Sequence, residues 1–397
     1  MAATDIQKRS TTALRKTPAE QLNHEHRSIT LINPFVPLST RIPQNKPGNF
    51  SKVLLSWYDT NHRDLPWRGK VDLYEIWLSE VMLQQTRVEY VRTYYERFLD
   101  TFPTLEELAA ADLDDVLRIW EGMGYYARAR NLHAAAREVV ASGRLPSSCK
   151  ELRLLPGIGP YISRATASIA FKEPVAAVDG NVRRVVSRIF SHPGTPAKLV
   201  QQLADQLLSA SRPGDHNQAM MELGSQVCTP KRPQCTVCPV QSYCSAWFEG
   251  TPERYPASKK KGPIPHHDVA VAVLRDASGR IFIQQRAPKG LLGGLWELPG
   301  GKAQPGESGP ATCARELHEE LGVQVLVGNM IGKVNHAYSH FRITLRAYEY
   351  IMIDGEPKST AGLTTAWVSP DELNKFAFPR ANRHILNLLA PPVAEAP

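Results

Sequence analysis

The segment Leu155–Tyr161, which reads Leu-Pro-Gly-Ile-Gly-Pro-Tyr, constrains this chain more than any other part of its sequence. An apolar stretch meets a Gly-x-Gly turn, and a proline at once starts a second helix. Gly157 and Gly159 tolerate positive φ and leave backbone N–H groups bare. Because a row of such groups binds a phosphate without reading sequence, we expect a hairpin between two helices that grips a phosphate backbone.

A lone aspartate follows eighteen residues after Tyr161, within Val178-Asp179-Gly180-Asn181. It is expected to start a new helix. Each feature alone has an ordinary explanation, which is a glycine-rich turn and an aspartate that caps a helix. Their order and spacing, together with cysteines further along the chain, favour a functional site instead.

Four cysteines lie close together in the second half of the chain. Their spacing is Cys228-x6-Cys235-x2-Cys238-x5-Cys244. The N-terminus lacks the apolar core of a signal peptide, so a reducing compartment is expected and the thiols are better interpreted as metal ligands than as disulfides. Soft thiolates in a tight tetrad suit zinc or an iron–sulfur cluster. Lys231 and Arg232, in the first loop, are expected to contact phosphates.

The hairpin, the aspartate and the cysteine spacing together resemble the endonuclease III superfamily of DNA glycosylases. The resemblance implies a 4Fe–4S cluster on the four cysteines, with zinc as the alternative. Members of the superfamily that also cut the strand hold a lysine at the position of Tyr161. A tyrosine offers no amine to form a Schiff base with the sugar, so the resemblance implies base removal alone.

Removing a base from DNA requires a proton for the leaving base and a negative charge beside the sugar cation. Asp179 supplies one carboxylate. The other should be a carboxyl in an apolar setting, where burial raises its pKa so that it stays protonated near neutrality. Glu80 is the only acid in the apolar stretch Trp77–Thr86. It is therefore the candidate acid, although an acid on a helix more often lies on a solvated face.

This stretch and three others resemble the MutY-type adenine DNA glycosylases, over about residues 50–248. The other three motifs are Leu65–Arg68, Gly122–His133 and Asn217–Gly224. The family removes adenine mispaired with 8-oxoguanine. The resemblance implies that Glu80 protonates adenine and then activates water, while Asp179 stabilises the sugar cation or forms a transient adduct. Tyr161 and Asn181 would support Asp179.

The same resemblance assigns residues to recognition. Arg68 and Glu222 would contact the flipped adenine. Gln85 and Tyr125 would fill the gap that a flipped base leaves in the stack. Core packing is the competing interpretation for one of the two neighbouring tyrosines, Tyr125 and Tyr126.

A second motif lies nearer the C-terminus. It reads Gly301-x5-Glu307-x7-Arg315-Glu316-Leu-His-Glu319-Glu320-Leu-Gly and is a complete Nudix box. Glu316, Glu319 and Glu320 fall on one helical face, where three like charges are unfavourable unless a cation lies among them. Oxygen ligands suit magnesium or manganese bound to a diphosphate. A solvated acidic face is the alternative.

In MutY-type glycosylases this domain usually recognises 8-oxoguanine and has lost parts of the box. The intact box therefore points to an additional activity, the hydrolysis of oxidised dGTP. The stretch His336–His340 also resembles the lesion-reading loop of the family, a Phe-Ser-His sequence in which Tyr338 replaces the phenylalanine. The resemblance makes Ser339 the reader of the oxidised base.

Length and charge fit this organisation. The 397 residues carry 47 lysines and arginines against 39 aspartates and glutamates, and the net charge of +8 fits a polyanion partner. No apolar run approaches the roughly 20 residues that span a bilayer. The predicted boundaries are a flexible basic tail at 1–48, an all-α domain at 49–226, a cluster loop at 227–248, a linker at 249–266 and a Nudix-like α/β domain at 267–392.

The sequence thus predicts a multidomain α and α/β protein, a cytoplasmic, nucleoid-associated monomer that binds duplex DNA with A:8-oxoguanine or A:G mispairs. Three alternatives stay open: a thymine or uracil mismatch glycosylase, a hydrolase of oxidised dGTP with a DNA-binding helical domain, and a lesion binder without activity. The last would require the loss of Glu80 or Asp179, and both are present.

Overall fold

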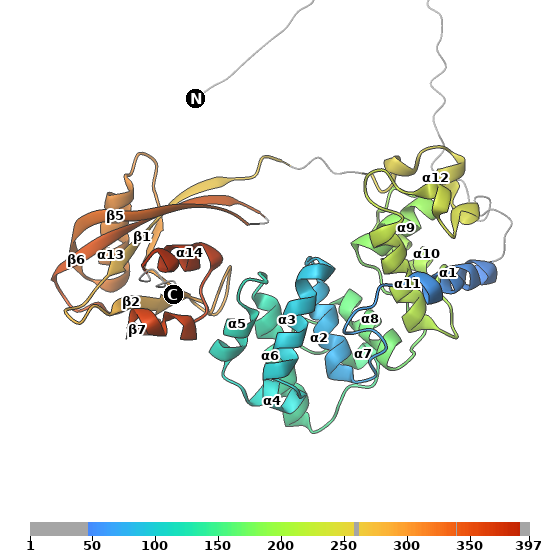
Figure 1. Ribbon diagram of the computed structural model, residues 1–397, viewed down its shortest axis with the longest axis horizontal. Coiled ribbons are helices and arrows are strands. Elements are labelled where there is room, and N and C mark those ends of the chain that lie inside the picture. The colour runs from blue at the N-terminus through green and yellow to red at the C-terminus, as the bar shows by residue number, and fades with distance from the viewer. Residues whose placement is uncertain (1–46, 258–261, 339, 390–397) are drawn as a thin grey trace, which may run out of the picture. The chain divides into compact units, whose positions relative to one another are not determined.

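The computed structural model describes residues 47–257, 262–338 and 340–389, which Figure 1 colours along the chain. The tail predicted at 1–48 lies outside the described residues except for its last two positions, and so does Ser339. Within the described residues every regular element before His266 is helical, and the strands begin at His266. The all-α and α/β parts therefore follow the predicted order. None of the described helices has the length and apolar character of a membrane span.

The helical part is built from short helices joined by tight turns. Its α-helices are α1 Pro47–Asn61, α2 Leu73–Leu83, α3 Val88–Thr101, α4 Leu105–Ala110, α5 Leu113–Trp120, α6 Ala127–Ser142, α7 Cys149–Leu152, α8 Pro160–Ala170, α9 Gly180–Ile189, α10 Ala197–Leu207, α11 Pro213–Gln226 and α12 Ser245–Phe248. Thr104 starts α4 in a capping box completed by Glu107, and the first turn of the helix is acidic.

Two hydrophobic clusters fill the helical part. One gathers buried side chains of α2 to α6, and the other gathers those of α1, α9, α10 and α11. The apolar residues of α9 lie on one face and belong to the second cluster: Val182, Val185, Val186 and Ile189. Between the two groups lies α8, which packs against both α2 and α11 (Figure 1). Side chains at the start of α8 therefore meet residues from both clusters.

The α/β part holds two sheets of order β4-β1-β6-β5 and β3-β2-β7. The strands are β1 His266–Leu274, β2 Ile281–Gln285, β3 Trp296–Glu297, β4 Gly300–Lys302, β5 Gln324–Ala337, β6 Arg342–Asp354 and β7 Thr365–Val368. Strands β1 and β6 are parallel, and the other pairs are antiparallel.

Both faces of β1 are covered from Ala270 to Leu274, where every residue is apolar and buried. Val271 and Val273 pack with helix α14, Arg380–Leu389, and the alternate residues Ala270 and Ala272 pack with helix α13, Gly309–Leu321. This is the period-two alternation of a strand between two layers. Helices α13 and α14 are α-helical, whereas Pro370–Lys375 forms a 3-10 helix.

Candidate functional site

Glu80 and Tyr161 form the centre of the site. Glu80 lies on α2 with only 5% of its surface exposed, and its Oε2 accepts a hydrogen bond from the Tyr161 hydroxyl at 2.6 Å. Burial raises the pKa of Glu80, while the Tyr161 hydrogen bond and the charge of Arg68 oppose the rise. The carboxyl therefore keeps its proton to a higher pH than a solvated glutamic acid does.

Asp179 is both a helix cap and a neighbour of this pair. Its Oδ1 accepts from the Val182 N–H at 2.7 Å at the start of α9, and its Oδ2 accepts from Asn181 Nδ2 at 3.1 Å. Burial raises the pKa of Asp179, and the hydrogen bonds from Val182 and Asn181 counter the rise. The charge of Asp179 in turn raises the pKa of Glu80 and of Tyr161, so the three groups lie together.

One expected contact differs. The resemblance placed Tyr161 in support of Asp179, but the Tyr161 hydroxyl donates to Glu80. Asn181 alone of the two expected partners bonds Asp179. The reason is geometric: Tyr161 lies one residue into α8, and α8 packs on α2, the helix that carries Glu80.

Arg68 and Glu222, both expected to contact the adenine, bond each other in a network that the sequence did not reveal. Glu222, on α11, is 1% exposed, and its Oε2 accepts from Arg68 Nη2 at 3.0 Å. Arg63 Nε donates to the other carboxylate oxygen at 2.7 Å, and Arg68 also bonds Gln218. Burial opposes the charge, but Arg63 and Arg68 hold the pKa of Glu222 below its usual range. Arg63 was not predicted, since the sequence shows it only as a basic residue just before the Leu65–Arg68 motif.

The Gly-x-Gly hairpin is formed, but its two glycines differ. Gly157 has φ +73°, and a Cβ there would lie 2.4 Å from the Cβ of Asn131. Gly159 instead has φ −80° and is the N-cap of α8, so it does not use the positive φ that a glycine tolerates. No atom lies within 4 Å of a Cβ built on Gly159. Gly157 is therefore required by the protein itself, whereas Gly159 leaves open space.

The two expected wedge residues share an unusual backbone. Gln85, just after α2, has φ +55°, and Tyr125, just before α6, has φ +50°. Both are exposed, whereas Tyr126 is buried in the core. Core packing is thus the correct interpretation for Tyr126, and Tyr125 remains available at the surface.

The four cysteines are free thiols that line one cavity together with Arg188. Arg188 Nη1 donates to Cys228 Sγ at 3.2 Å and to the Thr229 carbonyl at 2.7 Å. Burial raises the pKa of Cys238 to about 12 and that of Cys244 to about 11. Among the described residues no three His, Cys, Asp or Glu side chains gather around one ion position. A cavity walled by four soft donors suits zinc or an iron–sulfur cluster.

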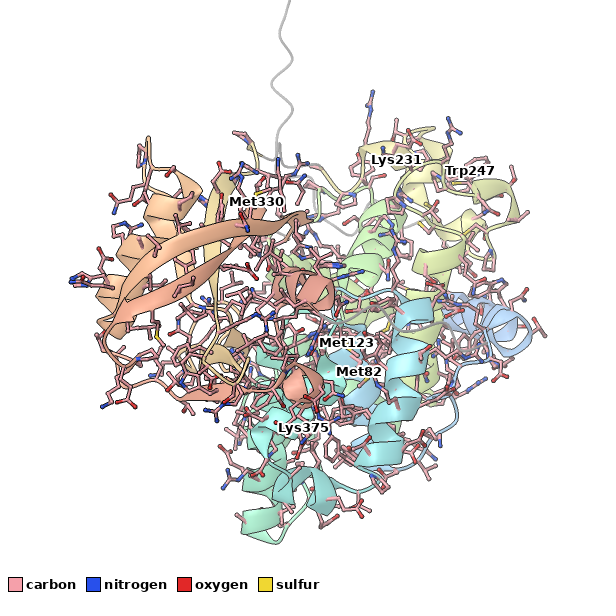
Figure 2. The ribbon with its side chains drawn as sticks, turned by 60° about the vertical axis from the view of Figure 1, so that its left-hand side comes forward. Met82, Met123, Lys231, Trp247, Met330 and Lys375 are labelled. Carbon is pink, nitrogen blue, oxygen red and sulfur yellow. The ribbon has the colours of Figure 1, made fainter. Side chains whose placement is uncertain are left out.

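An arginine that the sequence did not single out joins the thiol loop to Asp179. Arg184, on α9, donates through Nε to the Cys228 carbonyl at 2.7 Å and through Nη2 to Asn181 Oδ1 at 3.0 Å. Since Asn181 donates to Asp179, one chain of hydrogen bonds runs from the thiol loop to the carboxylate. Lys231 and Arg232 are exposed in that loop, where Figure 2 labels Lys231.

The Nudix box differs from its expected geometry. Arg315 donates to Glu307 at 2.9 Å, to Glu316 at 3.0 Å and to Glu319 at 3.1 Å, while Glu320 accepts from Gln284 at 2.9 Å. The like charges expected to need a cation are thus partly balanced by Arg315. Magnesium binding at the box stays a prediction.

Comparisons with known proteins match each part of the chain. Residues 78–210 match the HhH-GPD superfamily base excision DNA repair protein, residues 228–244 the iron-sulfur binding domain of endonuclease III, and residues 270–388 the NUDIX domain. The chain is 35% identical to the adenine DNA glycosylase of Rattus norvegicus over 85% of its length and 77% of that protein. It is 34% identical to that of Homo sapiens, over 85% and 73%.

Solved structures match the parts separately. A thermostable thymine-DNA glycosylase aligns with 51% of the chain and 97% of its own length, at 28% identity and a TM-score of 0.48. The MutT protein of Methanosarcina mazei Go1 aligns with 32% of the chain and 94% of its own length, at 24% identity and a TM-score of 0.30.

Proposed function

Because this chain belongs to the family of adenine DNA glycosylases, it is a DNA N-glycosylase, and we propose that its substrate is adenine mispaired with 8-oxoguanine or guanine in duplex DNA. One observation carries the chemistry: a buried carboxyl with a raised pKa, Glu80, lies beside a second carboxylate, Asp179. A thymine or uracil mismatch glycosylase is disfavoured by the adenine-removing relatives.

Glu80 supplies the proton in this proposal. It protonates a ring nitrogen of the extruded adenine, the N-glycosidic bond breaks, and its electron pair leaves with the base. A water molecule then adds to the sugar and returns its proton to the Glu80 carboxylate, so the sum is hydrolysis. General acid–base steps of this kind contribute about 10²- to 10⁴-fold to a rate.

Asp179 supplies the negative charge that the sugar cation requires in this proposal. Its hydrogen bonds from Val182 and Asn181 fix the carboxylate in place before the reaction. Tyr161 provides no amine, which supports base removal without strand cutting. Arg68 and Glu222 are proposed to contact the adenine, and Ser339, which lies outside the described residues, to read the oxidised guanine.

The chain carries an iron–sulfur binding domain, and we propose that its cluster is 4Fe–4S. Cys228, Cys235, Cys238 and Cys244 would hold it. The bound cluster would fold the loop that presents Lys231 and Arg232 to phosphates. Arg188 would help to hold the folded loop, since it bonds the Cys228 sulfur and two loop carbonyls, those of Thr229 and Pro230.

Glu80→Gln tests the proposal, because glutamine keeps the shape of the side chain but cannot give a proton. We expect adenine release from an A:8-oxoguanine duplex to be lost and affinity for that duplex to be nearly unchanged. Single-turnover base release and a binding titration measure the two. Glu96→Gln, an exposed glutamate on α3, is the control.

A:G and T:G duplexes belong in the same assay. Release of thymine but not adenine would overturn the assignment of substrate, and full activity of Glu80→Gln would overturn the assignment of the acid.

Hydrolysis of oxidised dGTP by the Nudix domain is a second candidate. A cavity lined by the box residues Glu316 and Glu320, with Lys302 and the apolar Phe341, favours it. The magnesium site stays a prediction, since Glu319 accepts a hydrogen bond from Arg315. Incubation with oxidised dGTP and magnesium tests it: we expect pyrophosphate or phosphate release that Glu319→Gln abolishes, and no release at high enzyme concentration would make the box a relic.

A further inference from the structure

Arg128, in the first turn of α6, connects two segments that the proposed function places against DNA. Its guanidinium donates to five acceptors: Val81 O at 3.0 Å, Met82 O at 2.8 Å, Gln84 O at 2.6 Å, Thr86 Oγ1 at 3.2 Å and Gly124 O at 3.2 Å. Four of these lie at the C-terminal end of α2 and just beyond it. The fifth lies in the loop before α6.

The contacts surround the two expected wedge residues. Gln85 lies between the acceptors Gln84 and Thr86, and Tyr125 directly follows Gly124. The Arg128 guanidinium also lies 5.3 Å from the centre of the Tyr125 ring. Figure 2 labels a methionine from each segment, Met82 and Met123, and both belong to the same hydrophobic cluster.

The backbone at both positions is strained. A residue other than glycine at positive φ costs free energy and persists only where its surroundings fix it. Gln85 and Tyr125 both have this conformation, at φ +55° and +50°. Arg128 contacts the chain next to each of them, so a single side chain fixes both strained positions.

Arginine suits this place better than lysine. Each of these five acceptors of Arg128 is a backbone carbonyl or a hydroxyl, and the end of α2 attracts a cation. Burial lowers the pKa of Arg128 to about 10, so the group is still charged at neutral pH. Its planar fork can bond two segments at once, whereas the ammonium of lysine acts as a point charge.

We propose that Arg128 is a positioning residue for base extrusion, which clamps Gln85 and Tyr125 into the geometry that fills the stack. Because α2 also carries Glu80, the same clamp fixes the wedge relative to the acid. The inference rests on the proposed function, in which a base leaves the duplex and a side chain takes its place.

The test follows extrusion directly. A duplex with 2-aminopurine beside the target adenine brightens when the stack opens, and single-turnover base release is measured on the same duplex. We expect Arg128→Gln to lose the fluorescence rise and to release adenine about 100-fold more slowly, because small misplacements have such effects. Duplex affinity, measured in the Glu80→Gln background, should stay within about threefold, because phosphate contacts dominate binding.

Three further variants separate positioning from folding. Arg137→Gln, an exposed arginine on the same helix, should behave as the wild type. Arg128→Lys should not restore the fluorescence rise, since it keeps the charge but cannot join both segments. Thr86→Val removes one contact and leaves the guanidinium in place, so it should reduce the rise even if Arg128→Gln does not fold.

The outcomes are distinct. A normal fluorescence rise in Arg128→Gln, or rescue by Arg128→Lys, would overturn the clamp. A loss of affinity as large as the loss of rate would also overturn it. Failure of the wild type to release adenine from A:8-oxoguanine would instead overturn the proposed function.

Discussion

At the scale of single residues, Glu80 and Asp179 show what local sequence can predict. Each stands in an unusual local setting, an acid in an apolar helix and an aspartate after a Gly-x-Gly hairpin, and the structure brings the two together. The arginines that complete the site could not be predicted in this way. Arg63 meets a residue 159 positions away, and Arg184 meets one 44 positions away. Such partners depend on how the helices pack.

The hydrogen bond from Tyr161 to Glu80 predicts a pH effect. That bond lowers the pKa of Glu80, so Tyr161→Phe should raise it further. The acid form is the active one, and its activity is lost as pH rises through its pKa. The alkaline limb of the single-turnover rate should therefore move to higher pH. A pH profile of adenine release measures this shift.

Tyr74→Phe is the matched control for this prediction. Tyr74 lies on the same helix as Glu80, and its hydroxyl donates to the Phe102 carbonyl, away from the site. The alkaline limb of the pH–rate profile of Tyr74→Phe should stay in place. A limb that moves to lower pH in Tyr161→Phe would contradict the assignment of Glu80 as the acid.

At the scale of elements, most helices and strands follow from their patterns. The apolar residues of α3 and α9 recur at helical spacing, and the turn at 276–279 separates β1 from β2, which belong to different sheets. The difference between the two hairpin glycines did not follow from the sequence, because it depends on packing: a side chain on Gly157 would meet Asn131 of α6, whereas Gly159 is the N-cap of α8 and leaves open space. Pro370–Lys375 forms a 3-10 helix, the form that short helical segments often take, and its helix type is not evident from so short a sequence.

The two hairpin glycines should respond differently to alanine. Gly157→Ala meets both a positive φ and the Asn131 side chain, so it should lower the free energy of unfolding by more than about 1 kcal/mol. Thermal unfolding measures this loss. Gly159→Ala has an ordinary φ and open space, so the melting midpoint should be unchanged.

Although its melting midpoint should be unchanged, Gly159→Ala should bind DNA more weakly. A methyl group there would keep a phosphate away from the N–H groups of the hairpin, and affinity should fall about tenfold, the effect of one charge-assisted hydrogen bond of ~1.5 kcal/mol. A titration with duplex DNA at fixed salt measures the change. Unaltered affinity would mean that the hairpin does not grip a phosphate.

At the scale of the whole molecule, hydrogen bonds connect the thiol loop to Asp179, the carboxylate proposed to stabilise the sugar cation. Arg188 joins the loop to α9, and Arg184 continues the connection to Asn181 and Asp179. Loss of the iron–sulfur cluster should therefore lower both thermal stability and adenine release. Chelation of the iron, followed by visible absorption, melting and base-release assays on one sample, measures all three.

The effect on activity should exceed any loss of folded protein. Release per folded molecule is the decisive quantity, since a purely local role of the loop would leave it constant. Unchanged melting and unchanged release after full bleaching would contradict this connection.

The double role of Asp179 as helix cap and charge has a consequence for cells that contain both a working copy and an Asp179 variant of this protein. Its carboxylate caps α9, and asparagine is about as good a cap as aspartate. Asp179→Asn should therefore fold, keep its cluster and sit on mispairs, yet lack the charge that lets the base leave. Such a protein would not merely be absent from repair: it would occupy lesions and shield them from the working copy. Mixing it with wild-type enzyme at limiting DNA should slow release beyond simple dilution.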